Sequence, residues 1–349
     1  MSDGIKISMR VPGTSPMPEL LELIGKIEDA GFDGAGILDS QMICRDTFVT
    51  MGLAASATSR LRLFPAVTNP FGRIPSVLAG AAQTVAEIAP GRTKFIIGTG
   101  YTSASTIGRR PATLRQMRRC VMEVKALLTG DSVDYGGTTN RLDFAGSDGG
   151  AGVPVLMAAS GPRSLELAGE VADGALVLVG YTPGIVGKAL EHLETGAKRS
   201  GRTLDDLDVV FAVRTCVADS NDEARRLARP VSVHWGLLWG GPNWIPYSDI
   251  EVPDYEIPQA VRGVYPDLGH APNWDEAIEL TQFVSDDVNT QLCDAMGLVG
   301  TPEHCTQRIR EMAQHGVNQI YLMPCLTFAP PETEVRAFGE HIIPALAQG

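Results

Sequence analysis

The sequence lacks the patterns that usually indicate metal, membrane or nucleic-acid chemistry. Its six cysteines are never spaced CxxC and its six histidines never stand at HxxxH, so we expect no metal site. No apolar run reaches the roughly 18 residues that a membrane helix needs. With 41 acidic and 29 basic residues, the formal charge of −12 argues against nucleic acid and anionic membranes as partners.

Two further absences concern the compartment and the source of electrons. No signal-peptide pattern precedes the first expected strand, so we expect a cytoplasmic protein with reduced, mostly buried thiols. No NAD(P)H-binding βαβ fingerprint is evident, so reducing power must come from outside the chain. The chain does have 349 residues, 44% hydrophobic content and 38 glycines, which are typical of a soluble globular protein with many tight turns.

Strand-like and helix-like segments alternate along most of the chain. We expect strands at 5–8, 34–38, 61–67, 94–97, 154–158, 174–179, 208–213 and 319–323. Helical patterns follow them at 18–30, 46–57, 75–89, 112–128, 163–172, 185–200, 222–228, 304–315 and 332–346. Eight strand-then-helix units predict one (β/α)₈ barrel domain over residues 1–349, with its active site where the strands end.

Two segments interrupt this alternation. Residues 131–152 hold a Gly136-Gly137 turn between short β-like runs and predict a hairpin excursion. Residues 229–298 contain all four tryptophans and many prolines, and we interpret them as an aromatic lid over a pocket. Trp235 and Trp239 are the candidate substrate contacts of this lid. The alternative is a packing appendage or a dimer contact.

The third strand breaks off at Thr68-Asn69-Pro70, shortly after Pro65. Proline has no backbone N–H to give a sheet, and Asn-Pro favours a turn, so this strand should end abruptly at the active-site edge. Ligands of α/β proteins bind at such strand ends. The alternative is an ordinary strand-to-helix turn in which Thr68 and Asn69 serve as caps.

Four stretches in order resemble the bacterial luciferase-like superfamily, in the branch around methylenetetrahydromethanopterin reductase. They are Leu38-Asp39-Ser40-Gln41, Val67-Thr68-Asn69-Pro70, Ala159-Ser160-Gly161-Pro162 and Gly300-Thr301-Pro302-Glu303. The resemblance implies a (β/α)₈ barrel that binds FMN or the deazaflavin F420. It also implies a non-proline cis peptide at Ala66-Val67, against which the flavin ring leans.

Given this resemblance, candidate cofactor-binding residues follow three strands. Ala66 and Val67 would form a flat shelf, with Thr68 and Asn69 as polar contacts. Two loops are alternative candidates for binding the phosphate group of the cofactor. One is rich in glycine and hydroxyl groups, and the other lies at a helix N-terminus, where free N–H groups attract anions. These loops contribute Gly98, Gly100, Tyr101 and Thr102, and Ala159, Ser160, Gly161 and Pro162. Arg109, Arg110 and Arg163 are near enough in sequence to add positive charge.

Catalytic residues are harder to assign from the sequence. Luciferase carries a histidine just after its second strand, whereas this chain has Asp39-Ser40-Gln41 there. Asp39, Gln41 and His234 are therefore the candidates for an acid or base. Flavin chemistry tolerates such a loss because the cofactor carries the reaction.

Three functions fit these residues. The main hypothesis is a two-component monooxygenase that takes reduced FMN from a separate flavin reductase and oxygenates a small, largely apolar substrate. The alternative is an F420-dependent reductase or dehydrogenase, which the Val67–Pro70 match favours, although residues 101–105 lack the acidic residue found in many F420 relatives. A third possibility is a non-catalytic flavin-binding accessory protein. The resemblance also implies a homodimer formed through the second and third helices.

Overall fold

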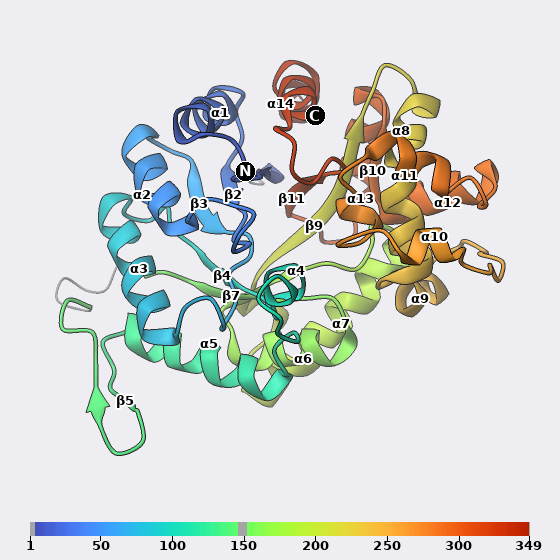
Figure 1. The fold of residues 1–349 in the computed structure, drawn as a ribbon. Coiled ribbons are helices and arrows are strands. Elements are labelled where there is room, and N and C mark those ends of the chain that lie inside the picture. Colours follow the sequence, from blue (N-terminus) through green and yellow to red (C-terminus); the bar gives the residue numbers. More distant parts are fainter. Residues whose placement is uncertain (1–3, 146–151, 349) are drawn as a thin grey trace.

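The computed structural model describes residues 4–145 and 152–348. Eight parallel strands form a nearly closed barrel in the order β3-β2-β1-β11-β9-β8-β7-β4. Isolated parallel bridges from Leu63 to Thr93 and from Thr68 to Ile97 join β3 to β4. The predicted fold is therefore confirmed (Figure 1). The strands are β1 (Lys6–Val11), β2 (Gly34–Ile37), β3 (Arg62–Pro65), β4 (Phe95–Ile97), β7 (Val155–Ala159), β8 (Gly174–Val177), β9 (Asp208–Val217) and β11 (Gln319–Pro324).

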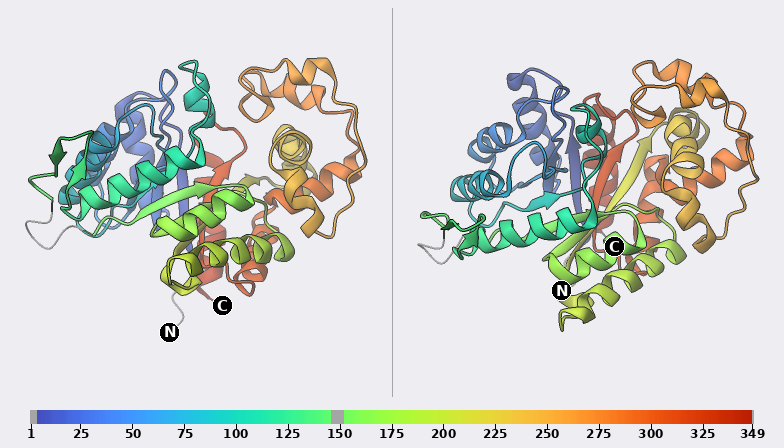
Figure 2. Two further views of the ribbon diagram at one scale, coloured as in Figure 1. Left: turned by 90° about the horizontal axis from the view of Figure 1, so that it is seen from below. Right: turned by 60° about the horizontal axis from the view of Figure 1, so that its bottom comes forward.

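Helices wrap the outside of this sheet (Figure 1; Figure 2). Several begin where the sequence supplies a cap: Asp46 accepts from the N–H groups of Phe48 and Val49, both at 3.0 Å, at the start of α2. The barrel helices are α1 (Met17–Asp29), α2 (Thr47–Ala57), α3 (Pro75–Ile88), α5 (Leu114–Leu128), α6 (Pro162–Val171), α7 (Pro183–Arg199), α8 (Asn221–Val233), α13 (Pro302–Ala313) and α14 (Glu332–Ala337). In the described part of the chain, no helix is both long and apolar enough to cross a membrane.

The barrel interior is filled by side chains from most of its strands. Phe64 and Tyr321 meet edge to face, with ring centroids 5.5 Å apart. Ile96, Leu156 and Leu176 pack around them. This plug closes the barrel below the carboxyl ends of the strands and forms the floor of the space at their mouth.

The first interruption contains a short antiparallel pair, β5 (Val133–Asp134) and β6 (Thr139–Asn140), which projects away from the barrel (Figure 1). Residues 146–151 of the expected excursion lie outside the described residues.

The second interruption begins later than we expected, because α8 does not stop at residue 228. It runs through Pro230 to Val233 and continues as a π-helical turn, His234–Leu238. Tertiary contacts outweigh the proline: buried Arg229 donates to the Thr281 and Val284 carbonyls and to Asp286, the last at 2.7 Å.

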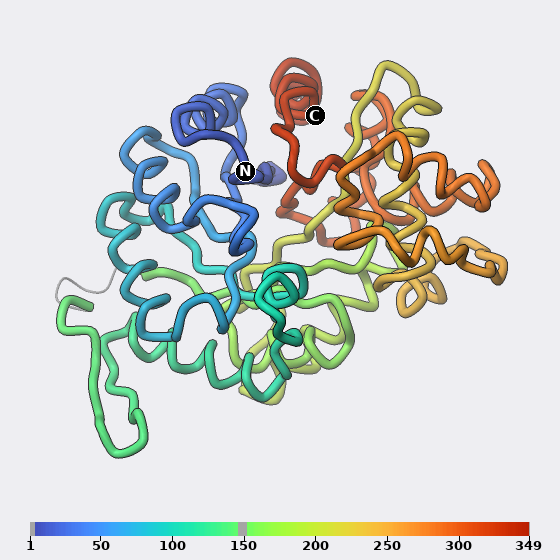
Figure 3. The backbone as a smooth tube through the Cα atoms, viewed as in Figure 1, coloured from blue at the N-terminus to red at the C-terminus, as the bar shows by residue number. Residues whose placement is uncertain are grey.

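Short helices make up the rest of this segment, which follows one side of the barrel in yellow to orange (Figure 3). They are α9 (Gly241–Trp244), α10 (Gln259–Arg262), α11 (Trp274–Leu280), α12 (Asp286–Met296) and the 3₁₀ turns Ile245–Tyr247 and Leu268–His270. The segment ends in an unpredicted strand, β10 (Gly297–Gly300). This strand pairs with residues 214–217 of β9, on the edge that β8 occupies at residues 208–211.

Candidate functional site

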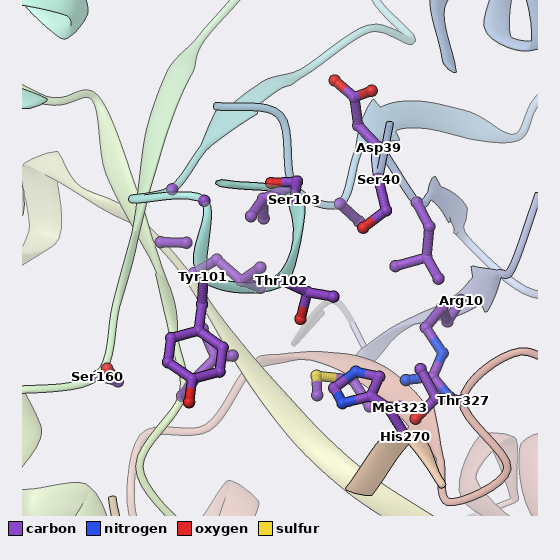
Figure 4. A pocket seen from close by; sticks show the side chains of 18 of the residues that line it. Arg10, Asp39, Ser40, Tyr101, Thr102, Ser103, Ser160, His270, Met323 and Thr327 are labelled. Atoms are coloured by element: carbon purple, nitrogen blue, oxygen red, sulfur yellow. The ribbon is translucent and has the colours of Figure 1, made fainter. Parts of the chain in front are cut away.

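A cavity opens where the barrel strands end, and we call it the mouth cavity. Its walls come from the ends of the barrel strands, the loops that follow them, and the inserted segment between α8 and α12. Figure 4 shows Arg10, Thr102 and His270 around one space, from which the Asp39 carboxylate points away. This is the edge at which the sequence analysis expects the active site.

The peptide between Ala66 and Val67 is cis, as the resemblance implies, and both residues line the mouth cavity. Gly98 lies directly behind Val67: a β-carbon at Gly98 would come within 2.8 Å of Val67 Cγ2 and 3.4 Å of Ala158 Cβ. Ala158 and Ala159 continue the wall. Small side chains and exposed main chain thus give this side of the cavity a flat, apolar surface, which we call the shelf.

Gly98, Gly100, Tyr101 and Thr102 also line the cavity. The predicted loop is partly a short helix, α4 (Tyr101–Ser105), and Gly100 enters it with φ of 79°, which favours glycine.

Asn69 holds this loop in place without lining the cavity. It is fully buried, its Nδ2 donates to Ser103 Oγ at 3.1 Å, and its Oδ1 accepts from the N–H groups of Phe71 and Gly72, both at 2.9 Å. Thr68 is buried beside it and also lies outside the cavity wall. Asn69 therefore acts as the turn-forming residue of the alternative interpretation. The Thr68 hydroxyl is buried without a partner among the described residues, and a direct contact of either residue with a cofactor stays a prediction.

Only two of the four candidate residues in the second loop line the cavity. Ala159 and Ser160 line the cavity, whereas Gly161 and Pro162 do not. The Gly161 N–H donates to Ser164 Oγ at 3.0 Å and is used in capping α6. Arg109, Arg110 and Arg163 also lie outside the cavity wall.

Of the two catalytic candidates that follow β2, only one lines the cavity. Asp39 lines the cavity, but its carboxylate pairs with Arg73 Nη1 at 2.9 Å, and Arg73 also binds Asp46. Gln41 lies outside the cavity wall, with its amide buried and unpaired among the described residues. The expected acid or base is thus an ion-pair partner in one case and remote from the cavity in the other.

Of the lid candidates, His234 and Trp239 reach the cavity. Trp235 is buried under the lid instead, where its indole N–H donates to the Val179 carbonyl at 3.0 Å. Burial lowers the pKa of His234 to about 4, although the charge of Asp267 opposes this shift. His234 is therefore neutral at pH 7 and is poorly suited to donate a proton there.

Comparison with known proteins decides the family. The family model described as luciferase-like monooxygenase matches residues 3–319. The chain belongs to this family. It is an oxidoreductase by that membership and by its relatives.

Two curated relatives and one solved structure illustrate the match. The chain is 28% identical over 335 residues to 5,10-methylenetetrahydromethanopterin reductase of Archaeoglobus fulgidus, covering 94% of this chain and 96% of that protein. It is 30% identical over 251 residues to an F420-dependent glucose-6-phosphate dehydrogenase of Nakamurella multipartita, covering 67% and 72%. The coenzyme F420 dependent tetrahydromethanopterin reductase from Methanopyrus kandleri shares the fold, with a TM-score of 0.77 at 22% identity and coverage of 99% and 100%.

Two arginines, an aspartate and a histidine of this luciferase-like protein were missed from the sequence. Arg10, Arg214, Asp267 and His270 all line the mouth cavity. A single arginine within an apolar strand run was an available signal for Arg214, but the expected strand ended at residue 213. Asp267 and His270 are spaced Asp-x-x-His, but no periodic helix or strand pattern surrounds them, so the sequence does not indicate where in the fold they lie.

Asp267 and His270 form a dyad at the lid side of the cavity. His270 Nδ1 lies 2.8 and 2.9 Å from the two oxygens of the Asp267 carboxylate, and His234 Nε2 is 3.7 Å from one of them. Burial alone would raise the pKa of Asp267, but the hydrogen bond and charge of His270 lower it overall. Asp267 is therefore ionised at neutral pH and orients the His270 ring.

Proposed function

We propose that this protein is an F420-dependent oxidoreductase that moves a hydride between the deazaflavin and a small organic substrate. The observation that carries the proposal is the shelf at the barrel mouth, lined by the small side chains of Ala66, Val67 and Ala158, in a chain with relatives named as F420-dependent enzymes. The names of those relatives agree on the cofactor and differ in the substrate. They favour this alternative over the two-component FMN monooxygenase that was our main hypothesis.

The residues present fit a flat heterocyclic cofactor. The shelf offers main chain and small side chains to one face of a ring, and the Thr102, Ser103 and Ser160 hydroxyls line the same cavity as hydrogen-bonding groups. When bound, F420 supplies two-electron hydride chemistry. The protein's part is then to position the ring and substrate, exclude water and handle a proton.

His270 is the residue best placed to hold that proton. Its Nδ1 faces the Asp267 carboxylate, so Nε2 is the nitrogen left for a substrate. Reduction of a polar double bond needs a proton at the atom that does not receive the hydride, and a positioned histidine supplies one. This role replaces our assignment of an acid or base to Asp39, Gln41 or His234.

Binding titrations test the proposal. Purified protein is titrated anaerobically with F420 and, separately, with reduced FMN, and oxygen is then admitted. We expect tight F420 binding and no peroxyflavin absorbance. Binding of reduced FMN with such an absorbance would restore the monooxygenase hypothesis, and binding of neither cofactor would favour the accessory protein.

A matched pair of glycine variants tests the location of the site. Gly98→Ala places a methyl group 2.8 Å from Val67 and must displace the shelf, whereas Gly25→Ala adds one where no atom lies within 4 Å. We expect F420 affinity to fall about tenfold or more only in Gly98→Ala, because ring contact depends on the shelf. Equal affinities in the two variants would move the cofactor elsewhere.

We also propose a homodimer formed through α2 and α3. Large apolar side chains on these two helices are exposed, among them Val49 at 59%, Leu53 at 43% and Val77 at 52%. Clustered exposed apolar side chains are typical of protein interfaces. A separate reductase that supplies the reduced cofactor stays a prediction from the missing NAD(P)H fingerprint.

A further inference from the structure

Two arginines that the proposed chemistry does not use line the mouth cavity. Arg10 lies near the end of β1 and is only 4% exposed, and Arg214 lies in the second half of β9. Across residues 4–145 and 152–348, neither guanidinium has a carboxylate within ion-pair distance. Two other arginines show the contrast: Arg229 pairs with Asp286 at 2.7 Å, and Arg73 with Asp39 at 2.9 Å.

Their hydrogen bonding is also incomplete. A guanidinium carries five N–H donors. Within the described chain, Arg10 is seen to donate only to the Pro324 carbonyl, and Arg214 Nη1 is buried without any acceptor. Buried donors are normally satisfied, so an unpaired one beside a cavity calls for an acceptor that is not part of the chain.

The charges around the arginines leave this part of the cavity positive. Burial lowers the pKa of Arg10 only to about 10, so it stays charged at neutral pH. Burial raises the pKa of the Tyr321 phenol and of the Glu334 carboxyl, which weakens Glu334 as a counter-charge. Asp267 is the ionised carboxylate of the cavity on this side, and its charge acts on Arg214, so one negative charge stands against the two guanidinium groups.

The arginines face the shelf from the opposite wall. β1 and β9 flank β11, whereas the shelf and the Gly98–Ser103 loop belong to β3, β4 and β7 on the far arc of the barrel. Figure 4 shows Arg10, Thr327 and His270 gathered on one side of the cavity and Ser160 on the other. A ring on the shelf therefore leaves the arginines and His270 to a second molecule.

We propose that the substrate carries an anionic oxygen group, a carboxylate or phosphate, which Arg10 and Arg214 bind in this part of the cavity. Arginine suits such groups because its planar donors match two oxygens at once. The bound anion presents the rest of the substrate to the space between the shelf and His270. This inference rests on the proposed function for the identity of the second molecule, but the anion site itself does not need F420.

The test compares wild-type protein with Arg214→Met, which removes the charge and keeps an unbranched side chain, and with Arg214→Lys, which restores the charge. Arg115→Met, on the exposed face of α5, is the control for a lost positive charge. Inorganic phosphate and malonate are the probes, added at constant ionic strength with chloride as reference. Thermal stability is followed with and without F420, and F420 affinity is measured separately.

We expect phosphate or malonate to raise the melting temperature of wild type and Arg115→Met. In Arg214→Met the apparent anion affinity should fall about tenfold or more, with partial recovery in Arg214→Lys. The melting temperature of Arg214→Met without probes should not fall, because an unpaired buried charge is removed.

Three results would overturn the inference. Equal anion effects in wild type and Arg214→Met would show that the arginines do not hold the anion. Loss of F420 affinity in Arg214→Met would make the anion part of the cofactor and not the substrate. A lower melting temperature of the variant without probes would mark Arg214 as a structural residue. If wild type binds the anions but not F420, the proposed function fails while the anion site stands.

Discussion

The neutral His234 should make the protein lose stability as the pH falls below about 6.5. The folded protein holds the pKa of this histidine at about 4, against an ordinary value of 6.5, because its ring is buried. Between these values the unfolded chain binds a proton that the folded chain refuses, so acid favours unfolding. The stability is complete above pH 6.5 and is lost progressively down to the folded pKa.

The size of the effect follows from the two pKa values. Between pH 8 and pH 5, a shift from 6.5 to about 4 lowers the free energy of unfolding by about 2 kcal/mol. The lowered pKa of Asp267 adds nothing in this range, because its contribution is lost only below its ordinary value of 3.8. His234 therefore dominates this part of the pH profile of the lid.

Urea unfolding at pH 8 and pH 5 measures the effect. We expect the difference in free energy between the two pH values to shrink by about 2 kcal/mol in His234→Leu, and not in a variant of the exposed His315. Titrating groups that do not interact with His234 contribute equally to wild type and variant and cancel, and Asp267, which does interact with it, titrates below this pH range. An unchanged pH difference in His234→Leu would refute the reasoning.

Three more predictions concern the loop, the dyad and the dimer. Asn69→Ala removes the acceptor of two N–H groups and the hydrogen bond to Ser103. Urea unfolding should show that the free energy of unfolding falls by about 2–4 kcal/mol, and a fall of less than about 0.5 kcal/mol would contradict this role. Asp267→Asn should change the tautomer of His270, seen as altered ring ¹⁵N shifts in NMR; identical spectra would mean that Asp267 does not orient the ring. Val49→Asp should yield monomers in analytical ultracentrifugation, and an unchanged dimer would place the interface elsewhere.

The barrel was predictable because its strands are short apolar runs bounded by turn residues. The misses have local causes. Gly297–Gly300 follows the irregular insertion and stands outside the regular strand-then-helix units, and it is a strand because β9 extends past β8. Pro230 predicts a helix end, which the buried bonds of Arg229 override. Contacts distant in sequence decided both cases.

The site was predictable where parallel strands end and not where the insertion folds back. Ala66, Val67 and Gly98 reach the cavity because the carboxyl ends of neighbouring strands meet at one edge. Asp267 and His270 reach it through a segment without periodicity, whose path depends on packing against α8. Asn69 shows a further limit, since a turn-forming asparagine and a ligand-binding one look the same in sequence.

The long β9 strand anchors the lid side of the cavity at one place on the barrel. The chain leaves β9 after Val217 through α8 and the inserted segment, and it returns as β10 beside residues 214–217, so this whole excursion begins and ends at one strand. A segment tethered this way can grow, shrink or be replaced without shifting the register of the eight barrel strands. Exchange of this excursion would replace Asp267, His270 and the rest of the lid side of the cavity, and it would leave the shelf across the barrel in place.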